Sequence, residues 1–169
     1  MAKPVIANPG YLLKAYAVDF LFIENAKRIE RDLGIKLLGV VDLPISVRAE
    51  TRVALIDQLE IIQFVQSVIV NVNGKGDNAI KLFEIIASFD FGIIKYSSYR
   101  VGKNGFTFLP EFFKTLSDFS LFTTHGIMYS KLSNTFLQGL VLPPLGTSNL
   151  DLKSIQVIGQ IMPSKDISD

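Results

Sequence analysis

Apolar and mixed positions alternate without a break from residue 82 to residue 93. The even positions carry polar and apolar side chains, whereas the odd positions are all apolar: Phe83, Ile85, Ala87, Phe89, Phe91 and Ile93. Because successive side chains of a strand point to opposite faces, this pattern predicts one long strand with an apolar face. Three phenylalanines make that face suitable for burial in a core or for binding another chain.

A second long strand is predicted before this one. The chain is mostly apolar over residues 53–72, and one strand face would carry Phe64, Val68, Val70 and Val72. Residues 71–78 (NVNGKGDN) are dense in turn formers, so the two strands are expected to form an antiparallel hairpin. Each strand would be about 15 residues long, against a typical 5 to 6.

The residues before the hairpin predict further elements. Aromatic and apolar residues indicate a strand over residues 16–23, and residues 11–15 are compatible with either a strand or a helix. Residues 25–34 are highly charged and end in glycine, which is typical of a solvated linker or one short helical turn. Residues 35–41 are apolar again and predict a strand that Pro44 closes.

The apolar spacing changes after a second turn at residues 102–105 (GKNG). Residues 109–116 predict a short helix with Pro110 at its start, and residues 119–134 predict a longer one that Gly126 weakens. The longer helix would have one face formed by Leu121, Phe122, His125, Met128, Tyr129 and Leu132. The two prolines at 143–144 require an extended chain, and residues 155–161 could form one more helix or strand.

Composition limits the class of protein. The 169 residues suit a single domain over 1–169, with flexible ends expected at 1–10 and 163–169. Hydrophobic residues make up 49% of the chain, which suggests a homo-oligomer that buries part of its surface. A net charge of +1 without a dense basic run argues against nucleic acid as a partner. The absence of cysteine excludes disulfides and thiolate chemistry, and suits the cytoplasm.

The sequence gives little sign of catalysis, of metal or cofactor binding, or of membrane insertion. No apolar run approaches the roughly 20 residues that cross a bilayer, and no signal peptide is evident. His125 is the single histidine and has no carboxylate nearby in sequence, and Asp90 has no indicated partner. The GKGD at 74–77 superficially resembles a phosphate loop, but strands flank it on both sides. An enzyme centred on His125 or Asp90 is therefore the least supported class.

Aromatic residues are unusually dense between residues 83 and 113. Core packing could account for any one of them. A cluster spread over a strand, a turn and a helix start could also line an apolar groove for an extended polypeptide. The cluster comprises Phe83, Phe89, Phe91, Phe106, Phe108, Phe112 and Phe113.

Three stretches resemble the SecB-type protein-export chaperones and their SecB-like relatives. Residues 16–24 (YAVDFLFIE) resemble the family's first strand, in which an aromatic residue precedes an aspartate, a hydrophobe and a phenylalanine. Residues 82–84 (LFE) resemble its third strand. Residues 121–145, ending in LVLPPL, resemble its main helix and the apolar-proline segment that follows.

The resemblance implies an α+β fold, with a four-stranded antiparallel sheet packed with two or more helices, and a homotetramer built from two dimers. It implies a holding chaperone that binds unfolded or precursor polypeptides in hydrophobic grooves without nucleotide or metal. By position, Asp19 and Glu84 match acidic residues that face the export translocation motor, and Glu24 lies beside a third such position. The client groove would include Phe83, Phe89, Phe91, Phe106, Phe108, Phe136 and Leu142.

The chain departs from the family members that deliver clients to the motor, which are strongly acidic. It is near neutral, residues 25–52 are longer and more basic than the family's linker, and Gly146-Thr147 replaces an asparagine-phenylalanine pair. A SecB-like chaperone with specialised clients, such as an antitoxin or an envelope protein, is therefore the leading expectation. The alternative is a small α+β domain that encloses an apolar ligand such as a lipid.

Overall fold

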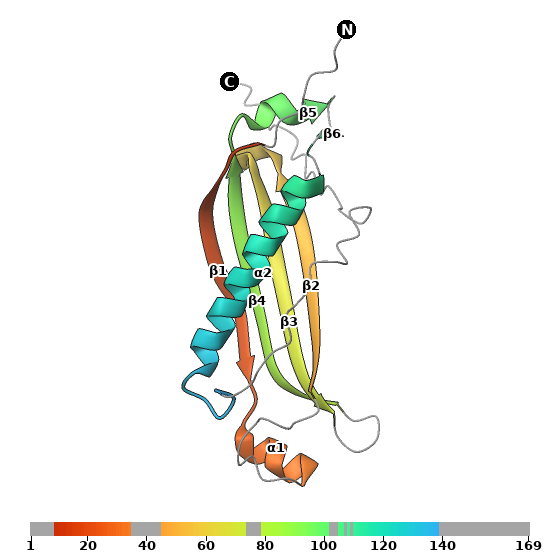
Figure 1. Cartoon of the computed structure of the whole chain (residues 1–169), viewed down its shortest axis with the longest axis vertical. Coiled ribbons are helices and arrows are strands. Elements are labelled where there is room, and N and C mark those ends of the chain that lie inside the picture. Colours follow the sequence, from red (N-terminus) through yellow and green to blue (C-terminus); the bar gives the residue numbers. More distant parts are fainter. Residues whose placement is uncertain are drawn as a thin grey trace, which may run out of the picture.

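A four-stranded antiparallel sheet in the order β1-β4-β3-β2 forms the centre of the protein, and one long helix crosses a single face of it (Figure 1). The computed structural model describes residues 9–34, 45–73, 79–101, 105, 106, 108 and 110–138. The predicted α+β class with a four-stranded antiparallel sheet is confirmed. The main elements are β1 (Tyr11–Ile23), α1 (Ala26–Leu33), β2 (Ile45–Ile56), β3 (Ile61–Asn73), β4 (Ala79–Ile93) and α2 (Pro110–Leu132).

The two central strands form the predicted hairpin. β3 has 13 residues and β4 has 15, and they pair antiparallel with Phe64 opposite Phe89 and Val68 opposite Ile85. Residues opposite each other point to the same face of a sheet, so the two apolar rows merge into one surface. The turn at residues 74–78 lies outside the described residues.

β2 was not predicted from the sequence, because its charged residues suggested a linker up to residue 52. Ile45, Val47, Ala49, Val53 and Leu55 nevertheless occupy odd positions, and charged residues lie at the even positions 48, 50 and 52, which is the strand period. A short 3₁₀ turn, η2 (Asp57–Leu59), joins β2 to β3. The apolar segment 53–72 therefore belongs to two strands. The predicted strand at residues 35–41 lies outside the described residues.

β1 contains two register shifts in its pairing with β4, one between Leu13 and Ala15 and one between Val18 and Phe20. The extra residues at these shifts are Lys14 and Asp19, the two charged residues of the strand. A β-bulge leaves one residue without a partner and changes which side chains face the core. The residues 11–15 that the sequence left open between helix and strand belong to the strand.

Local signals explain both ends of α1. The Asn25 side chain accepts a hydrogen bond from the Lys27 amide, and Gly34 ends the helix with a φ of 65°. An asparagine N-cap and a left-handed glycine are the usual residues at these two positions. Of the two alternatives predicted for residues 25–34, the helical one is nearer, but the helix has 8 residues rather than one short turn, and its Ile29 is fully buried.

The two helices predicted after residue 109 are one continuous helix of 23 residues, α2. Pro110 is its first residue, as predicted. No helix breaker separates Leu116 from Phe119, and the Ser120 hydroxyl donates to the Leu116 carbonyl at 2.7 Å. Ahead of α2 lie the 3₁₀ turn η3 (Tyr96–Tyr99) and the paired strands β5 (Arg100–Val101) and β6 (Gly105–Phe106), which flank the predicted second turn. The elements expected after residue 138 lie outside the described residues.

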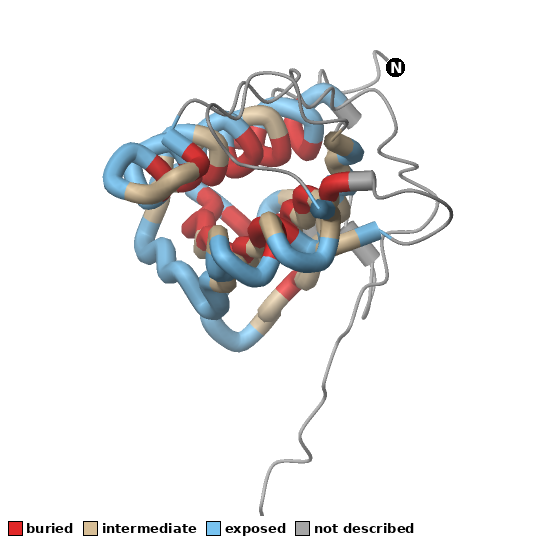
Figure 2. Tube along the Cα trace, turned by 90° about the horizontal axis from the view of Figure 1, so that it is seen from below, coloured by how far each residue is buried: buried red, intermediate tan, exposed pale blue. Residues whose placement is uncertain are grey.

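Buried residues lie between α2 and the sheet, and Figure 2 shows the buried positions of α2 on the side of the helix that faces the sheet. They form two apolar clusters. The upper cluster, near the start of α2, comprises Leu55, Ile62, Phe64, Ala87, Phe89, Phe91, Ile93, Tyr96, Phe112, Phe113 and Leu116. The lower cluster, near α1, comprises Ile29, Val68, Val70, Val72, Leu82, Phe83, Ile85, Met128, Leu132 and Leu137.

Candidate functional site

The predicted groove residues of β4 lie in the core. Phe83, Phe89 and Phe91 are each fully buried, with Phe83 in the lower cluster and the other two in the upper cluster. Their side chains share one face because the strand period places all odd residues beneath α2. In this structure they pack the sheet against the helix and do not line an open groove, so a bound polypeptide could reach them only if α2 moved.

The other predicted groove residues are dispersed. Phe108 is partly buried beside the upper cluster and stacks on Tyr99, with ring centroids 5.4 Å apart. Phe136 packs against the lower cluster, at the other end of α2. Phe106 belongs to β6 by its backbone, its side chain is not described, and Leu142 lies outside the described residues.

Of the three acidic residues predicted to contact the motor, Asp19 lies on β1, Glu24 directly follows β1, and Glu84 lies on β4. Two of them form ion pairs. Glu24 forms an ion pair with Arg28 at 3.1 Å, and Glu84 forms one with Lys81. Glu24 and Glu84 lie near each other. The Glu24 amide donates a hydrogen bond to the Leu82 carbonyl, and Glu84 lies opposite Phe22 in the register of β1 and β4. Asp19 is exposed at the second bulge of β1. Neighbouring cations thus offset the charge of two of the three carboxylates.

Exposed apolar side chains are concentrated on β1 and α2. Of the eleven large hydrophobic residues exposed in the described part of the chain, nine lie on these two elements. We call this set the β1–α2 surface. Its members are Tyr11, Leu12, Tyr16, Val18, Phe20, Leu21, Phe119, Phe122 and Tyr129. Exposed apolar side chains that gather on a few elements of a soluble protein often mark a binding site.

The helix contributes an apolar stripe to this surface. Phe119, Phe122, Gly126 and Tyr129 are all exposed and follow one another at spacings of three, four and three residues. This spacing keeps side chains in one line along a helix. The nearby charges of Lys114 and Asp118 pair with each other at 2.6 Å. The stripe was missed in the sequence because Phe122 and Tyr129 were assigned to the same face as Leu121, Met128 and Leu132, which are buried.

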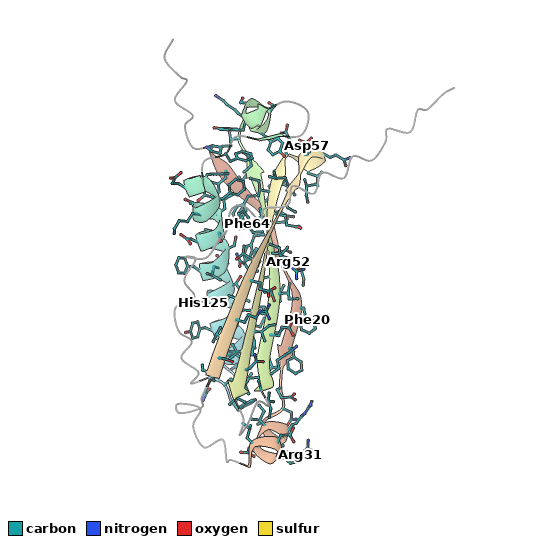
Figure 3. The ribbon with its side chains drawn as sticks, turned by 90° about the vertical axis from the view of Figure 1, so that its right-hand side faces the viewer. Phe20, Arg31, Arg52, Asp57, Phe64 and His125 are labelled. Carbon is teal, nitrogen blue, oxygen red and sulfur yellow. The ribbon has the colours of Figure 1, made fainter. Side chains whose placement is uncertain are left out.

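The strand contributes side chains on both faces of the sheet. Tyr16 and Val18 pair with the α2-facing residues Phe89 and Ala87, and the Tyr16 and Phe89 rings stack at 6.4 Å. Phe20 pairs with Ile86 and lies on the face away from α2, as Figure 3 shows. The exposed side chains of β1 therefore surround its outer edge.

The two edges of the sheet differ in charge. In the described residues β1 pairs only with β4, and β2 pairs only with β3, so both are edge strands. β2 carries Arg48, Glu50 and Arg52, and Glu50 pairs with both arginines. Charged side chains protect an edge against pairing with another strand. Because β1 has its two charges only at bulges, it is the less protected edge.

His125 lies on α2 between Phe122 and Tyr129 and is partly buried. Burial lowers the pKa of its imidazole, and its Nε2 atom is buried without a partner among the described residues. The Tyr129 ring meets it edge-on at 6.3 Å. Within the described residues, no three acidic or histidine side chains gather as metal ligands, and no helix combines the length and apolar character that a membrane span requires.

Comparison with known proteins finds likeness to solved structures. A solved structure of a protein of unknown function from Streptococcus agalactiae matches with a TM-score of 0.37 and 12% sequence identity, over 75% of this chain and 90% of that chain. No family model matches the chain, and no curated protein matches it. The class that the fold defines is a small α+β protein with one helix packed on an antiparallel sheet.

Proposed function

We propose that this protein is a holding chaperone of SecB-like type, which binds unfolded or precursor polypeptides on the β1–α2 surface. The observation that carries the proposal is the concentration of nine exposed large hydrophobic residues on one edge strand and one helix. The buried phenylalanines support an external surface rather than an enclosed ligand site, because they already pack against the protein's own side chains. The lack of cysteine suits action in the cytoplasm.

Apolar contact alone can provide useful affinity without sequence specificity. Covering one exposed aromatic side chain contributes about 2 kcal/mol, at about 25 cal/mol per Å² of apolar area. Several such contacts would offset the loss of translational and conformational freedom on binding.

The charge distribution favours clients over the export motor as partners. The net charge is +1, and Arg28 and Lys81 offset two of the three carboxylates that the family resemblance assigns to motor contact. Client binding should change little with salt, since apolar contacts are not screened, whereas a steep loss of affinity would indicate electrostatic binding.

We also propose that the protein is a homo-oligomer, with a dimer of dimers as the family resemblance implies. The support is the contrast between the two sheet edges. Antiparallel pairing of two β1 strands would satisfy the exposed backbone groups of both and cover part of their apolar side chains. The outer stripe of α2 would remain available for clients.

Suppression of aggregation tests the chaperone proposal. The protein is added at increasing ratios to a chemically unfolded client that aggregates on dilution, and light scattering is followed at low and high salt. The proposal predicts a dose-dependent loss of scattering that salt does not abolish. A protein that leaves scattering unchanged at severalfold excess, or that co-purifies with a bound lipid instead, would contradict it.

A further inference from the structure

A layer of polar side chains crosses the middle of the core. Gln66 on β3 and Ser117, Ser120 and Thr124 on α2 are at most 1% exposed. Along β3, Gln66 lies between Phe64 of the upper cluster and Val68 of the lower cluster. On α2 the three hydroxyl residues lie between Leu116 of the upper cluster and Met128 of the lower one. The four residues, here called the polar layer, therefore divide the contact between helix and sheet.

The hydrogen bonds of the polar layer stay within the sheet or within the helix. The Thr51 hydroxyl donates to Gln66 Oε1 at 2.7 Å, which joins β2 to β3. The Ser120 and Thr124 hydroxyls donate to carbonyls four residues earlier in α2, at 2.7 and 2.8 Å. Gln66 Nε2 and Ser117 Oγ are buried and have no partner among the described residues.

This arrangement weakens the contact between helix and sheet. A buried polar group without a partner destabilises the closed state, because it has lost its bonds to water and gained none in exchange. Gln66 and Ser117 would regain those bonds if α2 moved away. The sheet would keep its own hydrogen-bond ladders, since β1, β4, β3 and β2 pair without any contribution from α2.

We infer that α2 is a lid: it opens from the sheet in a step separate from unfolding of the sheet, and the polar layer sets how often it opens. Opening uncovers Phe64, Phe89 and Phe91, which are fully buried in the closed state. The use of that uncovered face by a client rests on the proposed function. The opening itself does not, because it is a property of the chain alone.

Hydrogen–deuterium exchange of the full chain without any client tests the inference. The quantity measured is the ratio of the exchange rate of α2 amides to that of β4 amides. A lid predicts a ratio of about ten or more in the wild-type protein, since local opening exchanges α2 while β4 stays protected. A ratio near one would mean that helix and sheet open only together, and would overturn the inference.

A matched pair of substitutions on β3 tests the role of the polar layer. Gln66→Met removes the buried amide at nearly constant volume and should lower the ratio severalfold, towards one. Gln63→Met alters the opposite face of the same strand, where Gln63 donates to Asp90 at 2.8 Å, and should leave the ratio unchanged. An unchanged ratio in Gln66→Met, or an equal fall in both variants, would contradict the inference.

Ser117→Ala removes the helix-side hydroxyl that has no partner in the described part of the chain, and provides the same test if Gln66→Met does not fold, with the same severalfold fall expected. A protein with a high exchange ratio that does not suppress aggregation would contradict the proposed function and leave the lid intact. A chaperone with a ratio near one would contradict only the lid.

Discussion

The ring of Phe91, on β4, lies where four elements meet, and it illustrates how single residues stabilise this fold. It contacts Tyr11 of β1, Phe64 of β3 and Phe119 of α2, with ring centroids between 5.7 and 5.9 Å away. Edge-on contacts of this kind add to the free energy gained by burying the rings. Phe119 therefore has two roles, because one part of it packs on Phe91 while 39% of it remains in the exposed stripe.

Replacing Phe91 with alanine should destabilise the protein by about 3–5 kcal/mol, because the cavity would lie in a fully packed cluster. Phe122→Ala is the matched control: the residue is 64% exposed, so the expected loss is within about 0.5 kcal/mol. Urea unfolding of both variants measures the difference. Equal losses would contradict the assignment of Phe91 to the core and Phe122 to the surface.

His125 should make stability depend on pH. Burial lowers the pKa of its imidazole, so the unfolded chain binds a proton more readily than the folded one. The stabilising effect is complete above the unfolded pKa of about 6.5 and is lost as the pH falls below it. The free energy of unfolding of the wild type, relative to His125→Gln, should therefore fall between about pH 7.5 and pH 5.5. A difference that stays constant or grows would contradict this.

At the scale of the elements, the sequence predicted the strands and helices that have a clear apolar period. It succeeded where the neighbouring elements do not alter which side chains are buried. The hairpin of β3 and β4 and the start of α2 at Pro110 follow from local spacing alone. β2 was missed because its charges were taken for a linker, although its odd positions are apolar except for Thr51. The bulges of β1 change which of its side chains face the core. The exposed stripe of α2 could not be distinguished from its buried face by sequence alone, because the position of the sheet determines which face of the helix is covered.

The N-cap of α1 should contribute measurably to stability. Asn25→Ala removes the side-chain bond to the Lys27 amide, and should destabilise the protein by about 1 kcal/mol. Asn25→Asp keeps an acceptor at the same place and should retain most of the stability. Thermal or urea unfolding of the two variants measures the difference. Equal losses of unfolding free energy in both would contradict a stabilising role for the side-chain acceptor at this position.

At the scale of the whole molecule, the two sides of the sheet and its two edges have different properties. α2 covers one face, charged residues protect the edge at β2, and exposed apolar residues lie along β1 and the outside of α2. The predicted groove residues on β4 are buried beneath α2. The sequence could therefore indicate a protein rich in apolar side chains, but not which of its aromatic residues are accessible.

The contrast between the edges predicts the oligomeric state. Light scattering should give the wild-type chain a mass of at least two copies. Val18→Lys introduces a charge on the outer edge of β1 and should shift the mass towards the monomer. Ala49→Lys places the same charge on an exposed position of β2 and should leave the mass unchanged. A monomeric wild type, or an equal effect of the two substitutions, would contradict assembly through β1.

The central claim is that the outer stripe of α2 binds unfolded polypeptides. Fluorescence anisotropy of a labelled, permanently unfolded polypeptide tests it most directly, with wild type, Phe122→Ser/Tyr129→Ser and the matched control Leu59→Ser/Ile94→Ser. Leu59 and Ile94 are as exposed as the stripe residues but lie outside β1 and α2. The account predicts that the stripe variant binds at least about tenfold more weakly, with the fold intact, while the control binds like the wild type. Equal affinities for all three proteins would contradict it.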